Sequence, residues 1–461
     1  MKEKVVLIGA GSAMFTRGLV FDLIRRNWEI DLALVDISPE ALDVAAGLTR
    51  KMIAAKRPAI ILHASTDRRE VLKDATVVIC TIGVGGRRAW EQDVYIPRKY
   101  GVYQPVGDSV MPGGTSRALR MLPAMVEIAK DVLDLAPGAL FFNYGNPMSC
   151  ICRGVRKATG ANLIGLCHGV NHVGKYLAQA LDVSAEVFQY TAVGLNHLTW
   201  FTEARVRGHD AMPRLRQFAR QRLAKQIEAV PPGTETGTAL RDASVPSGDN
   251  PLCWSLFDLF GAFPAVLDRH VSEFFPQFCC GGKYYGKTLG VDCFNFERVI
   301  AQGDKRFAEM RTAALSEQPL AAEYFASIGG EHEQVVDIIE SIRRNDRCIY
   351  SANLPNTGLV PNLPTETIVE VPAVADGGTL KGIAQPPLPS ALAGTLATRI
   401  AWVETAVEAA LEGSRDKFVQ ALVIDGWVNS IETASKLADE LLAAQAAFLP
   451  QFDSRQPDLS H

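Results

Sequence analysis

Cys167 and His168 lie next to each other at the end of an apolar run, in the segment NLIGLCHGVNH (162–172). His172 follows four residues after His168. A thiolate and an imidazole can bind a metal ion together, and a cysteine beside a histidine can also act as a nucleophile with its base. A strand that ends in small and polar residues has the same composition, so the chemistry of this segment depends on the rest of the chain.

Two later segments also place polar side chains directly after apolar ones. GLNH ends in Asn196 and His197, and LDRH contains Asp268, Arg269 and His270. A carboxylate and an imidazole can act as acid and base, and an amide offers a hydroxyl group both a donor and an acceptor. The structural alternative for Asp268 is an ion pair with the adjacent Arg269.

The N-terminal segment VVLIGAGSAMFT has the features of a dinucleotide-binding turn. Gly9 and Gly11 follow an apolar strand and precede a helix, so backbone N–H groups can approach a pyrophosphate there. Met14 stands where a GxGxxG motif has its third glycine, so a tight turn without a ligand is the alternative. Asp36 ends the second strand, where an acidic side chain binds ribose hydroxyls and favours NAD over NADP. The residues expected to bind the cofactor here are Gly9, Gly11, Ser12, Phe15 and Asp36.

The composition is that of a soluble globular enzyme. The chain has 461 residues, 48% of them hydrophobic, and a formal net charge of −4. This length allows two lobes that share a cleft, and the mild acidic balance argues against nucleic acid as a partner. The sequence predicts neither a membrane-spanning run nor a signal peptide, and its nine irregularly spaced cysteines indicate reduced thiols. We therefore expect a cytoplasmic protein without a membrane partner.

The first half of the chain alternates between strand and helix patterns, which predicts a Rossmann-like, doubly wound parallel sheet. Ser38 and Pro39 are the expected cap and first residue of the helix after the second strand. The expected strands lie at 4–9, 30–36, 75–83, 139–147 and 162–169.

The pattern of apolar and polar residues changes near residue 185. Residues 188–206 alternate as antiparallel strands do, and 230–251 has the composition of a long loop or lid. A short strand is expected within 354–378, and two helical stretches near 388–412 and 414–447. We predict an NAD-binding domain over 1–190 and a mixed α+β substrate and oligomerisation domain over 191–461, a layout similar to that of lactate and malate dehydrogenases.

Several separate segments resemble the family 4 glycoside hydrolases, and they occur in the same order as in that family. Its members are NAD-dependent, metal-requiring glycosidases. Together these segments span residues 9 to 276, with a weaker match around 354–364. The matching segments are GAGSAMFT (9–16), GGRRAWEQDVYIPRKYGVYQ (85–104), MPGGTSRALRMLPAM (111–125), NYGNPMS (143–149), CHGV (167–170), GLNHLTW (194–200) and DRHVSEFFP (268–276).

The resemblance implies that Cys167 and His197 hold a divalent metal ion such as Mn²⁺. Without it, a lone cysteine and histidine so far apart in sequence are more typical of a core. One thiolate and one imidazole leave coordination positions open for substrate hydroxyls and water, which suits a Lewis acid. His172 has no such support and is expected to pack or to cap a helix.

The resemblance also implies an unusual hydrolysis, because this family is an exception to the two-carboxylate scheme of most glycosidases. NAD⁺ removes hydride from C3 of the sugar, and the metal stabilises the enolate that forms when a base takes the C2 proton. The bond from C1 to oxygen then breaks by elimination, water adds, and the hydride returns to C3. NAD is regenerated in each turnover.

The roles of individual residues follow from the same resemblance. Asp268 is the expected base. His168 is expected either to assist departure of the leaving group or to hydrogen-bond a sugar hydroxyl. Asn146 is expected near the nicotinamide as well as the substrate. The residues expected to bind substrate hydroxyls or to line the pocket are Asn146, Asn196, Arg269 and His270.

The type of sugar is suggested by Trp90, which stands where phosphosugar-specific members have an arginine. An aromatic ring stacks on a sugar face but does not replace a guanidinium group for a phosphate. The CHGV form is similar to the branch of the family that uses unphosphorylated α-glycosides, and the segments 100–114 and 268–276 most resemble α-galacturonidases within it. We expect an α-galacturonidase, with α-glucuronides, α-galactosides and α-glucosides as alternatives, and a homodimer or homotetramer.

Two other classes of function remain open at this level. A net dehydrogenase of a hydroxy acid or sugar acid would share Gly9, Gly11 and Asp36 but would not need a metal at Cys167 and His197. It would release NADH stoichiometrically. A non-catalytic NAD-binding sensor is the third class, although it does not explain so many polar groups at motif positions.

Overall fold

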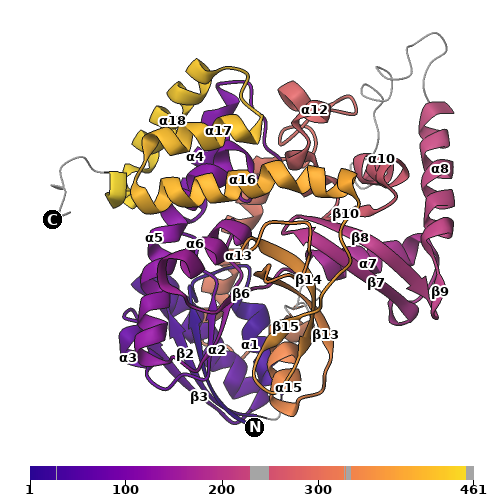
Figure 1. Cartoon of the computed structure of the whole chain (residues 1–461). Helices are drawn as coiled ribbons and strands as arrows, with labels where there is room; N and C mark the ends of the chain where they lie inside the picture. The colour runs from indigo at the N-terminus through magenta and orange to yellow at the C-terminus, as the bar shows by residue number, and fades with distance from the viewer. Residues whose placement is uncertain (27, 229–248, 327, 329–333, 453–461) are drawn as a thin grey trace.

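One mixed β-sheet extends through the whole molecule (Figure 1). The structure is a computed structural model, and it describes residues 1–26, 28–228, 249–326, 328 and 334–452. The strand order is β10-β8-β7-β14-β13-β6-β5-β4-β1-β2-β3, with β15 beside β14 and β9 beside β8.

The first part of the sheet is parallel and has the order β3-β2-β1-β4-β5-β6, which is the Rossmann order. The predicted α/β fold is therefore confirmed. Val5–Ile8 and all of β4 are buried, as near-continuous apolar strands covered on both faces must be. The strands are β1 (Lys2–Ile8), β2 (Glu29–Val35), β3 (Ile60–Ser65), β4 (Val77–Cys80), β5 (Leu140–Asn143) and β6 (Leu163–Gly165).

The edge strand β3 was not among the strands that the sequence predicted. Its residues alternate between intermediate and exposed positions, so IILHAS lacks the continuous burial of its neighbours. The cap of α2 (Pro39–Lys56) is confirmed, since the Ser38 side chain accepts a hydrogen bond from the Ala41 N–H.

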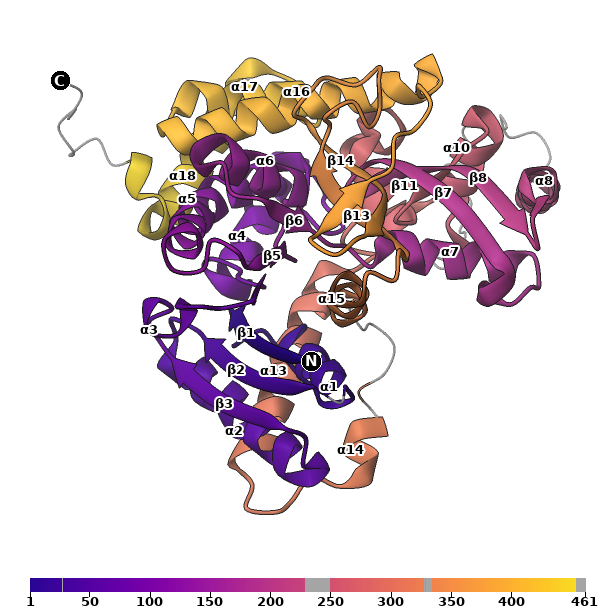
Figure 2. The same ribbon diagram turned by 60° about the horizontal axis from the view of Figure 1, so that its bottom comes forward.

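Helices cover both faces of the parallel part. One face packs against α1 (Thr16–Ile24) and α2, and the other against α3 (Arg69–Leu72), α5 (Met111–Leu135) and α6 (Met148–Thr159). Helices from the second half, α13 (Phe296–Leu315) and α15 (Val335–Arg344), join the cluster around α1 and α2. Figure 2 shows α13, α14 and α15 beside β1, β2 and α2.

The second part of the sheet is antiparallel, and the predicted antiparallel pair over 188–206 is confirmed as a hairpin. β13 pairs with β6 at Asn353 and Gly165, and β14 pairs with β7 at Glu370 and Gly194. The predicted boundary between residues 190 and 191 falls inside β7 and stays a prediction. The strands are β7 (Phe188–Leu195), β8 (Leu198–Val206), β9 (His209–Asp210), β10 (Phe263–Ala265), β13 (Ile349–Pro355), β14 (Ile368–Ala375) and β15 (Leu380–Gly382).

The chain ends in α16 (Ser390–Glu412), α17 (Arg415–Asp425) and α18 (Ile431–Gln445). The sequence predicted one helical stretch over 414–447, whereas the structure has two helices there, α17 and α18. Gly426 ends α17 with a φ of +82°, and the Ser430 side chain caps α18. In Figure 1, α16 begins near β10 and runs towards α5 and α6.

The remaining elements connect the two parts of the sheet and the helices that cover them. The predicted long loop over 230–251 falls almost entirely outside the described residues. Among those residues, no helix is long and apolar enough to cross a membrane. These elements are α4 (Gly86–Arg98), α7 (Gly169–Ala180), α8 (Met212–Glu228), α10 (Pro251–Phe260), α11 (Asp268–Val271), α12 (Pro276–Cys279), β11 (Lys283–Tyr284), β12 (Lys287–Thr288) and α14 (Ala322–Ala326).

Candidate active site

The turn after β1 has no room for side chains at Gly9 and Gly11. Gly9 has a φ of +90°, and a Cβ there would lie 2.7 Å from the backbone nitrogen of Ile82. A Cβ on Gly11 would lie 2.8 Å from Oδ2 of Asp36. At these two positions the backbone between β1 and α1 is not covered by a side chain, as close approach of a dinucleotide requires.

The carboxylate of Asp36 is fixed by two backbone donors. The Gly11 N–H donates to Oδ2 at 2.8 Å, and the Ser38 N–H donates to Oδ1 at 2.9 Å. Each carboxylate oxygen has a further lone pair, so the group can still accept from ribose hydroxyls. The Ser12 hydroxyl accepts from the backbone N–H of Phe15 at 3.3 Å, which places both predicted cofactor residues in this turn.

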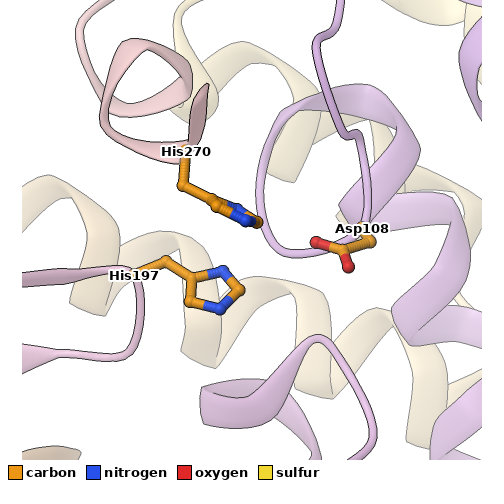
Figure 3. Close-up of side chains that lie close together, drawn as sticks. All are labelled: Asp108, His197 and His270. Carbon is orange, nitrogen blue, oxygen red and sulfur yellow. The ribbon is translucent and has the colours of Figure 1, made fainter. Parts of the chain in front are cut away.

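Three side chains from distant segments converge beyond the parallel strands (Figure 3). Asp108 precedes α5, His197 lies in the turn between β7 and β8, and His270 lies in α11. Their candidate ligand atoms all lie within 4.8 Å of one another, and the two imidazole centroids are 4.2 Å apart. Asn146, just beyond β5, donates to Oδ2 of Asp108 at 3.1 Å and so ties this cluster to the carboxyl edge of the sheet.

Hydrogen bonds assign the tautomer of His197. The Ser109 hydroxyl donates to Oδ1 of Asp108 at 2.7 Å, and it also lies 2.7 Å from Nδ1 of His197. A hydroxyl has one proton, so Nδ1 of His197 carries the N–H that donates to Ser109. Nε2 then keeps its lone pair, which is the arrangement of a metal-binding histidine held by a partner on its other nitrogen.

Both imidazoles are neutral at physiological pH. Burial lowers the pKa of His197 to about 4, opposed by Asp108 and reinforced by His168 and Arg269. Burial lowers the pKa of His270 well below its usual value, and the neighbouring His197, Arg269 and His168 lower it further. A metal ligand must be unprotonated, so this environment prepares both rings for metal binding.

The structure brings most of the predicted site residues together. His168, Arg269 and His270 all lie close enough to His197 for their charges to act on one another. Cys167 lies nearby, half-buried in the turn before α7, where its sulfur accepts from the Gly169 N–H at 3.4 Å. It does not belong to the three-residue cluster, so its role as a metal ligand stays a prediction.

Asp268 is completely buried and its carboxylate accepts three hydrogen bonds. Its donors are the backbone N–H groups of Leu252 and Cys253, at 2.8 and 2.7 Å, and the hydroxyl of Tyr284. The backbone donors belong to the first turn of α10, so Asp268 stabilises that helix N-terminus from a distant segment. No ion pair joins Asp268 to Arg269 among the described residues. Its role as the base stays a prediction.

Of the predicted substrate residues, Trp90 is held by its neighbours and Asn196 lies buried close to Glu370. Trp90 donates from its indole nitrogen to the carbonyl of Val106 at 2.8 Å, and its ring packs edge-on against Phe296. Asn196 is buried, and its amide lowers the pKa of Glu370. His172, which the sequence assigns to packing or capping, is exposed on α7.

Glu273 holds the loop that leads to Asp108. Its Oε1 accepts from the N–H groups of Val106 and Gly107 at 3.0 and 2.7 Å. Burial raises the pKa of Glu273 to about 8. This clamp fixes the position of Asp108 and, through Val106, that of Trp90.

Two residues missed by sequence reasoning connect the site to the sheet. Asn353 and Glu370 are register partners on β13 and β14, and they face Gly165 and Gly194 on the outer neighbours. Gly165 immediately precedes the Cys167 turn, and Gly194 precedes the His197 turn. The Glu370 carboxylate also accepts from the Thr199 hydroxyl at 2.6 Å. This row of paired residues sets the separation of the two turns.

The sequence matches two family models that together cover most of the chain. Residues 4–183 match "Family 4 glycosyl hydrolase", and residues 192–428 match "Family 4 glycosyl hydrolase C-terminal domain". The chain belongs to family 4 of the glycosyl hydrolases. It is therefore a glycosidase, and neither the dehydrogenase nor the sensor alternative is supported.

Relatives within family 4 act on different sugars. An α-glucosidase of Erwinia rhapontici is 31% identical over 97% of this chain and 99% of its own length. An α-galacturonidase of Bacillus subtilis is 31% identical over 92% of this chain and 93% of its own. A crystal structure of a 6-phospho-α-glucosidase from gut microorganisms, in complex with NAD and Mn²⁺, is 20% identical with a TM-score of 0.79, covering 98% of this chain and 100% of that one. The last likeness shows that the fold is shared.

Sequence reasoning missed Asp108, Ser109 and Glu273. Asp108 and Ser109 do lie in a segment used for the resemblance, directly after a buried glycine, but a lone carboxylate in a loop is a weak signal. Glu273 lies three residues after His270, in another such segment. A carboxylate among buried apolar residues was the only indication of its role.

Proposed function

We propose that this family 4 glycosidase hydrolyses unphosphorylated α-glycosides, preferably α-galacturonides, with NAD and a divalent metal ion such as Mn²⁺ as cofactors. The observation that carries the proposal is the cluster of Asp108, His197 and His270 at the carboxyl edge of a Rossmann-like sheet. The preference for galacturonides is supported by the α-galacturonidase relative.

The turn between β1 and α1 fits NAD because its two glycines leave the backbone accessible. When bound, NAD supplies a reversible acceptor for hydride from a sugar carbon. Gly9 and Gly11 permit the approach of the pyrophosphate, and Asp36 accepts from ribose hydroxyls. Asn146, which lies between this turn and the cluster, orients the substrate against the nicotinamide.

The donor set of the cluster fits a divalent metal ion. Two neutral imidazoles and one carboxylate are three ligands, which leave coordination positions open for substrate oxygens. When bound, the ion supplies a Lewis acid for adjacent sugar oxygens. We assign Asp108, His197 and His270 as its ligands and retain Cys167 as a further ligand from the sequence prediction.

Proton transfer is assigned to Asp268 and His168. Asp268 must exchange one of its three donors for the proton of the sugar when it acts as base. His168 donates a proton to the leaving group, or hydrogen-bonds a sugar hydroxyl. Asn196 binds a substrate hydroxyl, and Trp90 stacks on the sugar. Assembly as a homodimer or homotetramer and a cytoplasmic location complete the proposal.

The proposal is tested with p-nitrophenyl α-galacturonide, α-glucuronide, α-galactoside and α-glucoside. Each is incubated with the protein, NAD⁺, Mn²⁺ and a reducing agent, while nitrophenol release and NADH absorbance are followed. We expect nitrophenol release that depends on both cofactors, without net NADH, and fastest from the galacturonide. Faster release from a neutral glycoside would contradict the sugar assignment, and stoichiometric NADH without cleavage would contradict the mechanism.

A further inference from the structure

A second arginine, Arg117 of α5, lies among the residues of the site. Its Nε donates to the backbone carbonyl of Asn146 at 3.0 Å, and its guanidinium lies over the ring of Trp90, 5.9 Å from the centroid. One terminal nitrogen is 3.5 Å from the point where a Cβ on Gly83 would lie. The charge of Asp108 also acts on it. Arg117 therefore lies between the end of β4, the Asn146 turn and the cluster of Asp108, His197 and His270.

The terminal N–H groups of Arg117 have no protein acceptor among the described residues. Arg120, one turn later on the same helix, provides the contrast. It donates from both terminal nitrogens to the carboxylate of Asp93 and from Nε to the carbonyl of Val84. Arg117 donates a hydrogen bond only from its Nε. No carboxylate lies within ion-pair distance of its guanidinium in the described chain.

Leaving the charge of Arg117 unpaired is costly. Desolvation lowers the pKa of Arg117, and the nearby charge of Arg120 lowers it further. A partly desolvated cation with unused donors is stabilised when an anion occupies the space that it faces. Three neighbours of Arg117, namely Asn146, Trp90 and Asp108, belong to the proposed site, so a bound substrate is the anion that Arg117 can reach.

We propose that Arg117 binds the carboxylate of a uronate substrate and so gives the enzyme its preference for uronides over neutral glycosides. This inference rests on the proposed function and assigns its specificity to one residue. A guanidinium presents two parallel donors to a carboxylate, and the Asn146 carbonyl with the Trp90 ring holds those donors in place. Less side-chain entropy is then lost on binding.

Arg269 is the rival for this role, but its setting is different. It neighbours the imidazoles of His197 and His270, and its Nε is buried without a hydrogen-bond partner in the described structure. Among the described residues, no hydrogen bond holds the guanidinium of Arg269 as the Asn146 carbonyl holds that of Arg117. We therefore assign the carboxylate to Arg117.

The test compares Arg117→Gln, Arg117→Lys and Arg269→Gln with the wild type. For each protein, kcat/KM is measured on p-nitrophenyl α-galacturonide and α-galactoside with NAD⁺ and Mn²⁺. Binding of free D-galacturonate and D-galactose is measured by tryptophan fluorescence, since Trp90 adjoins Arg117. Circular dichroism shows whether each variant is folded. If Arg117→Gln does not fold, Arg117→Lys is used in its place to test the role of Arg117.

We expect Arg117→Gln to lower the galacturonide-to-galactoside ratio of kcat/KM by about 10- to 100-fold, the effect of losing a charge-assisted hydrogen bond. Galacturonate affinity falls in parallel, Arg117→Lys has an intermediate ratio, and Arg269→Gln changes the ratio by less than about threefold. An unchanged ratio in Arg117→Gln, or the selective loss in Arg269→Gln instead, would overturn the assignment.

The two levels of the proposal fail in different ways. A wild type that cleaves neutral glycosides but not galacturonides overturns the role of Arg117 and leaves the glycosidase mechanism intact. A wild type that cleaves no glycoside refutes the proposed function. In that case the binding of free D-galacturonate tests the role of Arg117. Selective binding of galacturonate that is lost in Arg117→Gln supports the assignment, and a protein that does not bind galacturonate selectively overturns it.

Discussion

Asp108 gives the cluster its only negative charge, since the imidazoles of His197 and His270 are neutral. A single carboxylate with two imidazoles binds a divalent cation without leaving a large excess of buried charge. The Ser109 hydroxyl connects Asp108 to His197, so the carboxylate also fixes the imidazole tautomer. Asp108 is therefore expected to affect metal binding both directly and through His197.

We predict that Asp108→Asn weakens Mn²⁺ binding by about tenfold or more, because it removes a charged ligand and disturbs the Ser109 link. The measurement is a titration of free Mn²⁺ followed by electron paramagnetic resonance. Cys167→Ser is the matched variant. An equal loss in Cys167→Ser would show that the thiolate belongs to the metal site as the sequence predicts, whereas unchanged affinity in Asp108→Asn would exclude Asp108 as a ligand.

Asp268 can be tested as base and as helix cap in one variant. Asp268→Asn keeps one oxygen for the N-terminus of α10 but cannot take a proton. We expect kcat to fall by about 10²- to 10⁴-fold. The free energy of unfolding should fall by about 1–3 kcal/mol, because a buried N–H loses its acceptor. A folded variant with less than a tenfold loss of kcat would leave Asp268 as a cap alone.

At the scale of elements, β13 and β14 connect the parallel and antiparallel parts of the sheet. The residues at both junctions are polar and buried, Asn353 beside Gly165 and Glu370 beside Gly194. The glycines allow these side chains to lie close to the neighbouring backbone: a Cβ on Gly165 would be 2.9 Å from the Cβ of Asn353. Glu370 is therefore the buried carboxylate on which the placement of the His197 turn depends.

Burial raises the pKa of Glu370 from 4.5 to about 7. The folded state then binds more protons than the unfolded state between these values, so this group's contribution is present below about pH 4.5 and is lost as pH rises through 7. We predict that Glu370→Gln gains stability relative to wild type by up to about 3 kcal/mol between pH 4.5 and 7.5. Urea unfolding at several pH values measures this, and a difference that does not change with pH would contradict it.

The predictability of the elements follows from how local their signals are. The strand at 4–9 and the Ser38 cap were predicted because adjacent residues determine them. The insertion of β13 and β14 between β6 and β7 was not, because strand pairing joins residues such as Gly165 and Asn353 that are far apart in sequence. Asp268, Arg269 and His270 were singled out because they are adjacent in one motif, and their roles stay predictions. Asp108 was missed because only the fold brings it close to His197 and His270.

At the scale of the whole molecule, the two halves of the sequence share one core. Val5 and Leu7 of β1 belong to the same buried cluster as Met310 of α13 and Val335 of α15. The helix α16 packs against both α5 and α6, and its Thr395 hydroxyl accepts a hydrogen bond from the indole N–H of Trp200 on β8. The predicted boundary between residues 190 and 191 therefore divides residues that share this core, and it stays a prediction.

We predict that neither 1–190 nor 191–461 folds alone, because each would expose the apolar surface that the other covers. Each fragment is expressed separately, and its thermal unfolding is followed by circular dichroism and calorimetry. The full chain is the control and should give a cooperative transition. A cooperative transition in the isolated 1–190 fragment would show that the Rossmann-like part is an autonomous domain.

The continuous sheet also bears on how such an enzyme acquires new substrates. Its hydrogen bonds run without interruption from the Gly9 turn to the His197 turn, so the spacing between the oxidant and the sugar is established as the chain folds. Substitutions on α4 and α5, such as those at Trp90 and Arg117, can therefore alter which sugar is accepted while the redox geometry is inherited unchanged.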